Sequence, residues 1–212
     1  MNHTGSVLAA GLAAVLLIAM KCEVPDSTAP VISASSGDVL LERNNAKVAL
    51  SDGLKLKSGD RVRVGDGQSS AEIRFTSGAK LRSHVGTEIV AGASSASKCA
   101  LTLVNGECFY NFAEEGPGND SIIIFVKSLK LSANNAVFSL YYNKETDEMI
   151  STVLFGGLVV AYGGTTKEVP VCSRISRVGD EEMELQAPSA SELEGLKVWA
   201  GSSIIEKTLA KT

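Results

Sequence analysis

The residues that could carry out chemistry in this chain lie mainly in short segments rich in serine and glycine. Gly67-Gln68-Ser69-Ser70-Ala71 is close to the G-x-S-x-G pattern of a nucleophilic serine, and the segment 65–70 is close to part of a phosphate-binding G-x-G-x-x-G. Both patterns require a strand that leads into a helix, whereas these residues lie between two expected strands. His84 follows Lys80-Leu81-Arg82, which indicates an exposed strand position and not a general base. We therefore interpret both segments as turns, expect no catalytic residue and predict that the chain is not an enzyme, with a hydrolase as the least favoured alternative.

The composition also argues against a metal ion, a cofactor and nucleic acid. The chain has 4 Cys and 2 His, and none of them forms a C-x-x-C or H-x-x-x-H pair, so no metal site or cofactor is expected. Twenty Lys and Arg against 24 Asp and Glu give a formal net charge of -4. Such a chain lacks the basic field that drives binding to phosphate backbones or to anionic lipid surfaces. Contact with a membrane is therefore expected only through the N-terminal segment or Cys22.

An apolar segment near the N-terminus predicts export. Val7 to Met20 comprises 14 apolar residues without a charge, which fits the core of a signal peptide better than a membrane span of about 20 residues. We expect residues 1–21 to be a signal peptide or an uncleaved membrane anchor, and residues 22–36 to be a flexible tether. Export would place the protein in the periplasm, at the outer membrane or on the cell surface.

The four cysteines leave two questions open. Cys22 stands where a bacterial lipoprotein carries its acylated cysteine, although Lys21 occupies a position that normally holds a small residue; lipidation and an unmodified thiol are the two alternatives. Of the remaining three, Cys99 lies too far from Cys108 to bond across an expected Asn105-Gly106 turn. We expect a disulfide from Cys172 to either Cys108 or Cys99, or else three buried free thiols.

The segments between Gly37 and Leu185 alternate apolar and polar residues with a period of two, which predicts strands. Glycine-containing turns separate them at short intervals, so we expect an all-β domain over residues 37–185, with many short antiparallel strands in a roll or a sandwich. The nearly continuous apolar runs Ile122–Val126 and Val153–Tyr162 predict central strands. The expected strands are Leu54–Lys57, Arg61–Val64, Ala71–Phe75, Ile122–Val126, Leu129–Ser132, Val137–Tyr142, Met149–Leu154, Leu158–Tyr162 and Arg174–Val178.

A short helical tail is expected over residues 186–212. Ser189-Ala190-Ser191-Glu192 has the spacing of a capping box, in which the serine and the glutamate satisfy free amides at a helix start. Gly195 and Gly201 each cost about 1 kcal/mol relative to alanine, so one or two short helices are expected. We expect Trp199 to anchor this tail on the sheet, or else the tail to dock a partner.

Several glycines are expected to be structural residues of turns. Gly59, Gly65 and Gly78 would allow a positive φ in tight turns, and Asp60 could accept a hydrogen bond from a nearby backbone amide. Gly106 and Gly157 lie in two segments, Leu103–Tyr110 and Leu154–Ala161, that share the order apolar pair, turn, glycine, strand. This weak internal repeat suggests two hairpins of one design.

The segment Leu56–Leu81 resembles the signature of the FecR-like domain. That family has an apolar residue before Gly-Asp, then strands separated by turns of defined type, and the later segments Leu103–Phe109, Ala136–Tyr141 and Val153–Val160 are similar to its further strands. Val64 and Ser77 depart from the pattern, which usually has Thr and Asp there. The resemblance covers roughly Gly37 to Val178. The matching residues are Gly59, Asp60, Gly65, Ser70, Ala71, Phe75, Gly78, Leu81 and Thr87.

The resemblance implies a function in the bacterial cell envelope. In the regulators that name the family, the domain follows a cytoplasmic anti-sigma segment, whereas here an apolar segment already begins at Val7. The chain is thus similar to exported FecR-domain proteins without that segment. We expect a non-enzymatic binding or scaffold module that engages an envelope protein or a cell-wall glycan. The acidic loop Glu114–Asp120 is either a recognition surface or, as is more common, simply a solvated loop. The alternative is a component of envelope signal transduction that acts with a separate membrane partner.

Overall fold

The computed structural model describes residues 29–95, 98–112 and 121–200, which form an all-β fold with one short helix, as predicted. All strand pairs in this part of the chain are antiparallel except β9–β10, which is parallel. No helix among these residues has the length and apolar character that crossing a membrane requires. The elements are β1 (Val31–Ser36), β2 (Val39–Arg43), β3 (Ala46–Val48), β4 (Leu54–Lys55), β5 (Arg61–Val64), β6 (Ser70–Arg74), β7 (Lys80–Ser83), β8 (Glu88–Ser95), β9 (Lys98–Asn111), β10 (Ser121–Val126), β11 (Leu129–Asn143), β12 (Glu148–Tyr162), β13 (Thr165–Val169), β14 (Ser173–Val178), β15 (Glu184–Gln186) and α1 (Ala190–Ala200).

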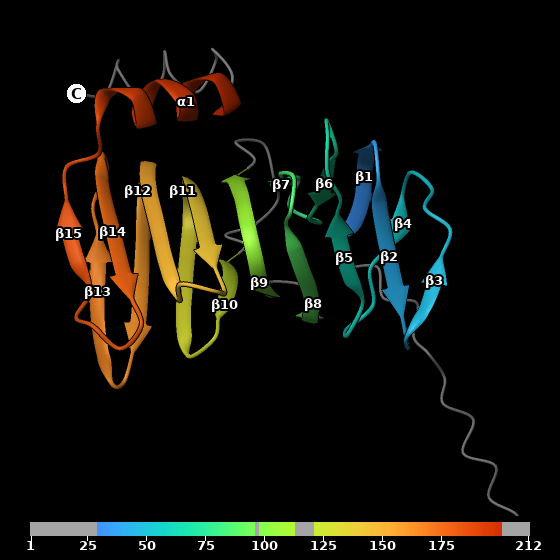
Figure 1. Cartoon of the computed structure of the whole chain (residues 1–212), viewed down its shortest axis with the longest axis horizontal. Coiled ribbons are helices and arrows are strands. Elements are labelled where there is room, and N and C mark those ends of the chain that lie inside the picture. The colour runs from blue at the N-terminus through green and yellow to red at the C-terminus, as the bar shows by residue number, and fades with distance from the viewer. Residues whose placement is uncertain (1–28, 96–97, 113–120, 201–212) are drawn as a thin grey trace, which may run out of the picture.

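The strands form one continuous sheet that folds into two layers (Figure 1). What we call the first layer contains β13, β10, β8, β5, β2 and β3, and the second layer contains β15, β14, β7, β6, β1 and β4. The three long strands β9, β11 and β12 run through both layers. One half of β11 pairs with β10, and its other half pairs with β9. These strands therefore hold the two layers together.

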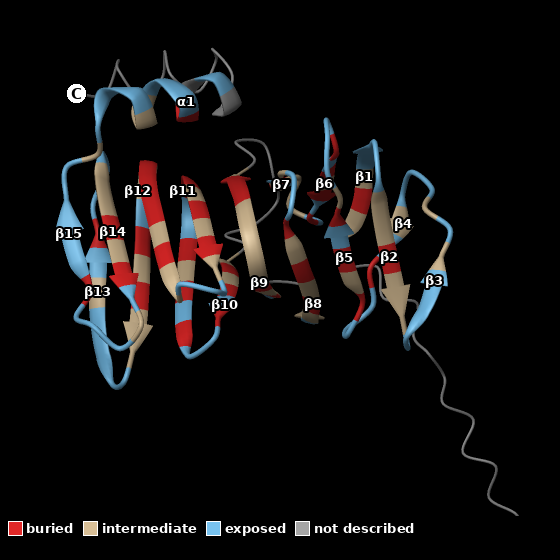
Figure 2. Cartoon of the chain, in the orientation of Figure 1, coloured by how far each residue is buried: buried red, intermediate tan, exposed pale blue. Residues whose placement is uncertain are grey.

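The core lies between the two layers. Ile73, Leu81 and Tyr110 of the second layer pack into one buried cluster with Ile89 and Leu103 of the first. Figure 2 shows that the buried residues concentrate on the long central strands, whereas β3, β13 and β15 at the ends of the row are largely exposed. Because residues alternate between faces along a strand, each layer has a second face that points away from this core.

Two expected hairpin turns are in fact bends within long strands. Gly106 lies inside β9 with a φ of 94°, and Gly156 lies inside β12 with a φ of 72°. A Cβ at Gly156 would approach the carbonyl oxygen of Asn135 to 2.2 Å. Asn135 in β11 also has a positive φ, of 47°, and the β11–β12 register shifts at this point. The two copies of the weak repeat are thus bulged strands that pass from one layer to the other, and the predicted turns are wrong.

Several other expectations are confirmed or corrected. The expected strand Arg61–Val64 coincides with β5, whereas Met149–Leu154 and Leu158–Tyr162 are two halves of the single strand β12. Strand β1 occupies residues 31–36, so regular structure begins inside the segment that we expected to be a tether. The capping box of α1 is confirmed: Ser189 Oγ accepts from the Glu192 amide at 3.2 Å, and Glu192 Oε2 accepts from the Ser189 amide at 2.7 Å.

The expected disulfide to Cys172 is wrong. Cys99, Cys108 and Cys172 are all free thiols. Cys108 of β9 pairs with Leu140 of β11. Strand β11 pairs on its other side with β12, and β12 pairs in turn with β14. Cys172 precedes β14, so three strand spacings, about 14 Å, separate it from Cys108, far beyond the roughly 7 Å that a disulfide can bridge. Cys99 is likewise separated from β12 by β10 and β11.

Candidate functional site

An ion pair with a buried carboxylate holds the turn before β5. Asp60 is 1% exposed and accepts from the Lys57 amide at 2.8 Å, which is the turn contact that the sequence predicted. It also accepts from Arg43 Nε at 2.8 Å and from Arg43 Nη2 at 2.6 Å. The hydrogen bond with Asp60 raises the pKa of Arg43. Arg43 comes from β2, and neither periodicity nor spacing pointed to it as the partner. We conclude that Asp60 is a structural residue.

The remaining predicted turn residues have unequal roles. Gly78, like Gly59, has a φ of 88° and sits in a tight turn as expected. Gly65 has no positive φ, but a Cβ there would come within 2.4 Å of Asp38 Oδ2, so the Asp38 side chain would have to move. Gly157 has neither a positive φ nor a close neighbour, so the conformational role falls to Gly156 instead.

The near-miss serine motif is a turn. Ser69 Oγ donates to the Asp66 carbonyl at 2.6 Å and accepts from the Asp38 amide at 2.9 Å. The first contact lies within the connection between β5 and β6, and the second ties that connection to the start of β2. Strand β6 follows Ser69 directly, whereas a nucleophile elbow requires a helix there. Cys22 and the loop Glu114–Asp120 lie outside the described residues, as does the side chain of Trp199. Among the residues that the structure describes, no three His, Cys, Asp or Glu side chains gather as a metal site would need.

The feature best suited to binding is what we call the α1 groove, on the face of the second layer that points away from the core. It consists of two hollows that meet at His84. The first has a volume of about 330 Å³, with Glu107, Tyr141 and Thr152 on its floor and Gly195 in its helical wall. The second has a volume of about 450 Å³ and extends over β7, β6 and β1. Its residues include Ser36, Ser70, Arg82 and, from α1, Val198.

Helix α1 forms the wall of this groove because a small apolar cluster and an ion pair hold it on the sheet. Leu196, which is 8% exposed, packs with Phe109, Val137 and Leu154. Arg174 Nη1 lies 3.1 Å from Glu192 Oε1. The capping hydrogen bond from Ser189 is the largest influence on Glu192 and lowers the pKa of its carboxyl.

His84 lies where the two hollows meet, and Glu107 lines the first hollow beside it. His84 Nδ1 is 3.6 Å from Glu107 Oε2. The backbone at this point is fixed, because the Glu107 carbonyl accepts from the His84 amide at 3.0 Å and from Thr87 Oγ1 at 2.8 Å. Burial lowers the pKa of His84, and the nearby Glu107 carboxylate only partly offsets that shift. At neutral pH the imidazole is therefore uncharged, and it does not neutralise the carboxylate of Glu107.

The second hollow contains an oriented guanidinium. Arg82 Nε donates to Glu72 Oε2 at 2.9 Å. Glu72 also accepts from Ser33 Oγ at 2.8 Å and has Lys80 Nζ at 3.3 Å. Burial alone would raise the pKa of Glu72, but these hydrogen bonds and the charge of Lys80 together lower it. The carboxylate thus stays ionised and holds Arg82, whose side chain remains 50% exposed, in place.

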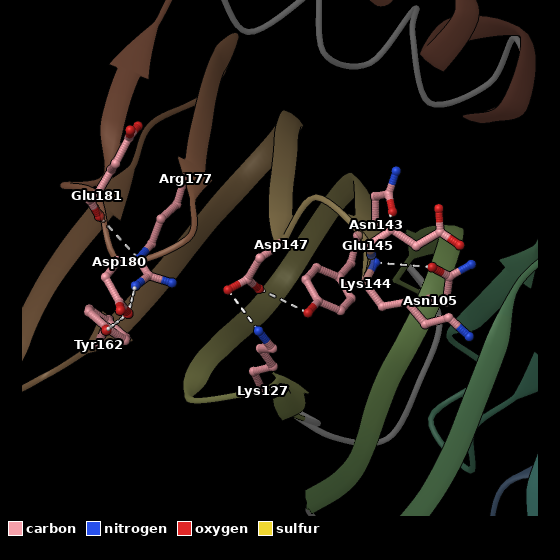
Figure 3. A network of polar contacts seen from close by, with 11 residues as sticks. Asn105, Lys127, Asn143, Lys144, Glu145, Asp147, Tyr162, Arg177, Asp180 and Glu181 are labelled. Carbon is pink, nitrogen blue, oxygen red and sulfur yellow. Dashed lines mark hydrogen bonds and ion pairs between the residues drawn. The ribbon is translucent and has the colours of Figure 1, made fainter.

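A separate polar network joins the turns at the β12–β14 end of the molecule (Figure 3). Asp147, in the turn between β11 and β12, accepts from Tyr142 Oη at 3.0 Å and lies 2.7 Å from Lys127 Nζ. The hydrogen bond from Lys127 is the largest influence on Asp147 and lowers its pKa. The guanidinium of Arg177 lies 3.7 Å from the centre of the Tyr162 ring. These contacts clamp turns together, and we assign the network a structural role.

The described residues form an all-β fold in which a single long sheet folds into two layers and helix α1 borders a groove lined by polar and apolar side chains. Two crystal structures of a candidate anti-sigma factor from Parabacteroides distasonis, at 1.65 Å and 2.50 Å, share this fold with a TM-score of 0.54 each. Their sequence identities to this chain are 15% and 14%. Each match covers 63% of this chain and 62% of the other, which is less than two thirds of that protein. No protein-family model matches the sequence, and no curated protein matches it.

Proposed function

We propose that this chain is a non-enzymatic protein-binding module of a bacterial cell envelope that takes part in signal transduction with a separate membrane partner. The observation that carries the proposal is the fold shared with the candidate anti-sigma factor from P. distasonis. The resemblance of the segment 56–81 to the FecR-like signature supports it, because Gly59, Asp60 and Gly78 of that signature form the turns around β5 to β7. The module would transmit a signal by binding and not by a chemical reaction.

The proposal includes export of the chain. Residues 1–21 would direct it across the inner membrane, and either that segment or a lipid on Cys22 would attach it to a membrane. Cell fractionation tests the location, and metabolic labelling with a palmitate analogue tests the lipid. Label that is present in the wild type and lost in Cys22→Ala supports lipidation, whereas recovery of the protein in the cytoplasm contradicts export.

The decisive experiment combines two measurements on the full chain in its native host. Deletion of the gene, with a complemented strain as the control, is followed by transcript profiling; we expect one set of promoters that depends on a single sigma factor to change. A tagged chain is then cross-linked in the envelope and purified, and a membrane protein should come with it. A partner without a transcriptional change would indicate a scaffold instead of a signalling component. Neither a partner nor a transcriptional change would refute the proposal.

A further inference from the structure

We propose that the α1 groove binds an extended peptide segment of the partner, with a basic side chain placed at Glu107 and an acidic group placed at Arg82. The inference rests on the proposed function, because it names the surface through which the module would engage another protein. It concerns the outer face of the second layer, and none of the residues labelled in Figure 3 lines this groove.

The dimensions of the groove suit a short peptide. The two hollows meet at His84 and together extend across β12, β11, β9, β7, β6 and β1. Five strand spacings correspond to about 24 Å, which is the length of about seven residues of extended chain. The volumes of about 330 Å³ and 450 Å³ fall in the range of ordinary ligand sites.

The charges in the groove are arranged for a ligand that carries both signs. Glu107 has a side chain that is 47% exposed, and its neighbour His84 is uncharged at neutral pH. Arg82 is 50% exposed, and Glu72 engages its Nε and so fixes the direction of the guanidinium. Arg82 lies on β7 and Glu107 on the adjacent strand β9, where Arg82 is in register with Phe109. A carboxylate of the ligand can pair with Arg82 while an ammonium group pairs with Glu107.

Gly195 gives the helical wall an opening. It lies in the middle of α1, is exposed and lines the first hollow. A Cβ at this position would meet nothing within 4 Å, so packing among the described residues does not require glycine here. Glycine at this position costs the helix about 1 kcal/mol relative to alanine. A ligand that approaches the helix backbone explains why this position lacks a side chain.

The lining favours a peptide over a glycan. Sugar rings commonly stack on an exposed aromatic face. The phenyl and phenol rings among the described residues of the groove, those of Phe109 and Tyr141, expose little of their faces. Phe109 is 3% exposed and lies under α1, and Tyr141 is half-buried. The groove is instead lined by charged groups of both signs, the carboxylates of Glu72, Glu107 and Glu192 and the guanidinium of Arg82. Apolar side chains of α1 lie beside them, and this mixture matches the side chains of a peptide.

The test measures the binding of fluorescein-labelled heptapeptides to the full chain by fluorescence anisotropy. The peptides consist of alanine and serine with one lysine and one glutamate, zero to three residues apart and in both orders. We expect one order to bind at least tenfold more tightly than the other. The double variant Arg82→Glu/Glu107→Lys should reverse this preference. Gly195→Leu should weaken binding of the preferred peptide at least tenfold while its melting temperature stays at or above that of the wild type, because leucine favours a helix.

The matched control exchanges the charges of an ion pair in the first layer. Arg63 and Glu42 are 45% and 26% exposed and lie 3.1 Å apart, so Arg63→Glu/Glu42→Lys makes the same charge exchange away from the groove and should leave peptide binding unchanged. Absence of binding by every peptide, or equal binding by the wild type and both groove variants, would refute the inference. Binding of a tetramer of N-acetylglucosamine that Gly195→Leu abolishes would refute it in favour of a glycan. If Gly195→Leu still captures the envelope partner in full, the groove inference fails while the proposed function stands.

Discussion

Removal of the Asp60 carboxylate should destabilise the whole fold by about 3 kcal/mol. Asp60 is 1% exposed, and Arg43 opposite it is 24% exposed. Breaking a buried pair by removing one partner typically costs 3–5 kcal/mol, since the other charge is left without compensation. Arg43 keeps some contact with solvent, which places Asp60→Ala near the lower end of this range. The Lys57 amide also loses its acceptor, at 2.8 Å in the structure.

The assay is a double-mutant cycle measured by urea denaturation. Arg43→Ala, Asp60→Ala and the double variant should give a coupling free energy of about 2 kcal/mol or more. The exposed pair Arg63–Glu42 is the control. Its coupling free energy should be below about 1 kcal/mol, as is typical of ion pairs on a protein surface. Asp60→Ala alone should lower the melting temperature by about 6–12 °C, at about 2–4 °C per kcal/mol for a chain of this size. A coupling between Arg43 and Asp60 no greater than that of the control pair would refute the reasoning.

Three further predictions concern single side chains. Gly156→Ala should cost more than about 2 kcal/mol because its Cβ would lie 2.2 Å from a carbonyl oxygen, whereas Gly157→Ala should be nearly neutral, both by urea denaturation. Burial raises the pKa of Cys108, so Ellman's reagent should leave this thiol unmodified until the protein is unfolded. His84 should titrate below its usual pKa by NMR, and lower still in Glu107→Gln. Because the folded protein binds this proton more weakly than the unfolded chain does, stability should fall as the pH drops below 6.5, and the loss is complete only below the pKa of His84 in the folded protein.

The sequence predicts the strands well, but it does not distinguish a turn from a bulge. Asn105-Gly106 and Gly156-Gly157 carry the same local signal as a hairpin, because both structures need a residue that tolerates a positive φ. Which of the two forms depends on the partners of the flanking strands. Each half of β12 pairs with a different half of β11, so the chain continues as one strand through Gly156. That choice is made by contacts between residues far apart in the sequence, and no local pattern contains it.

The capping box at Ser189 could be predicted because it depends only on residues close together in the sequence. Its donors and acceptors lie within four residues, and the structure contains both hydrogen bonds. The disulfide prediction failed because pairing of cysteines depends on the order of strands in the sheet. The odd number of cysteines and their spacing along the chain could not show that β11 and β12 lie between Cys108 and Cys172.

The α1 groove shows how far a site can be inferred before the strand order is known. Ser36 and Val198 line the same hollow from opposite ends of the described chain, and their proximity follows only from the folding of the long sheet into two layers. Gly195 is different, because its cost to the helix was visible in the sequence. The cost raised a question that the sequence could not answer, namely whether anything approaches the helix at this position. The structure places the groove at that position, and the comparison of Gly195→Leu with the wild type decides whether a ligand is that reason.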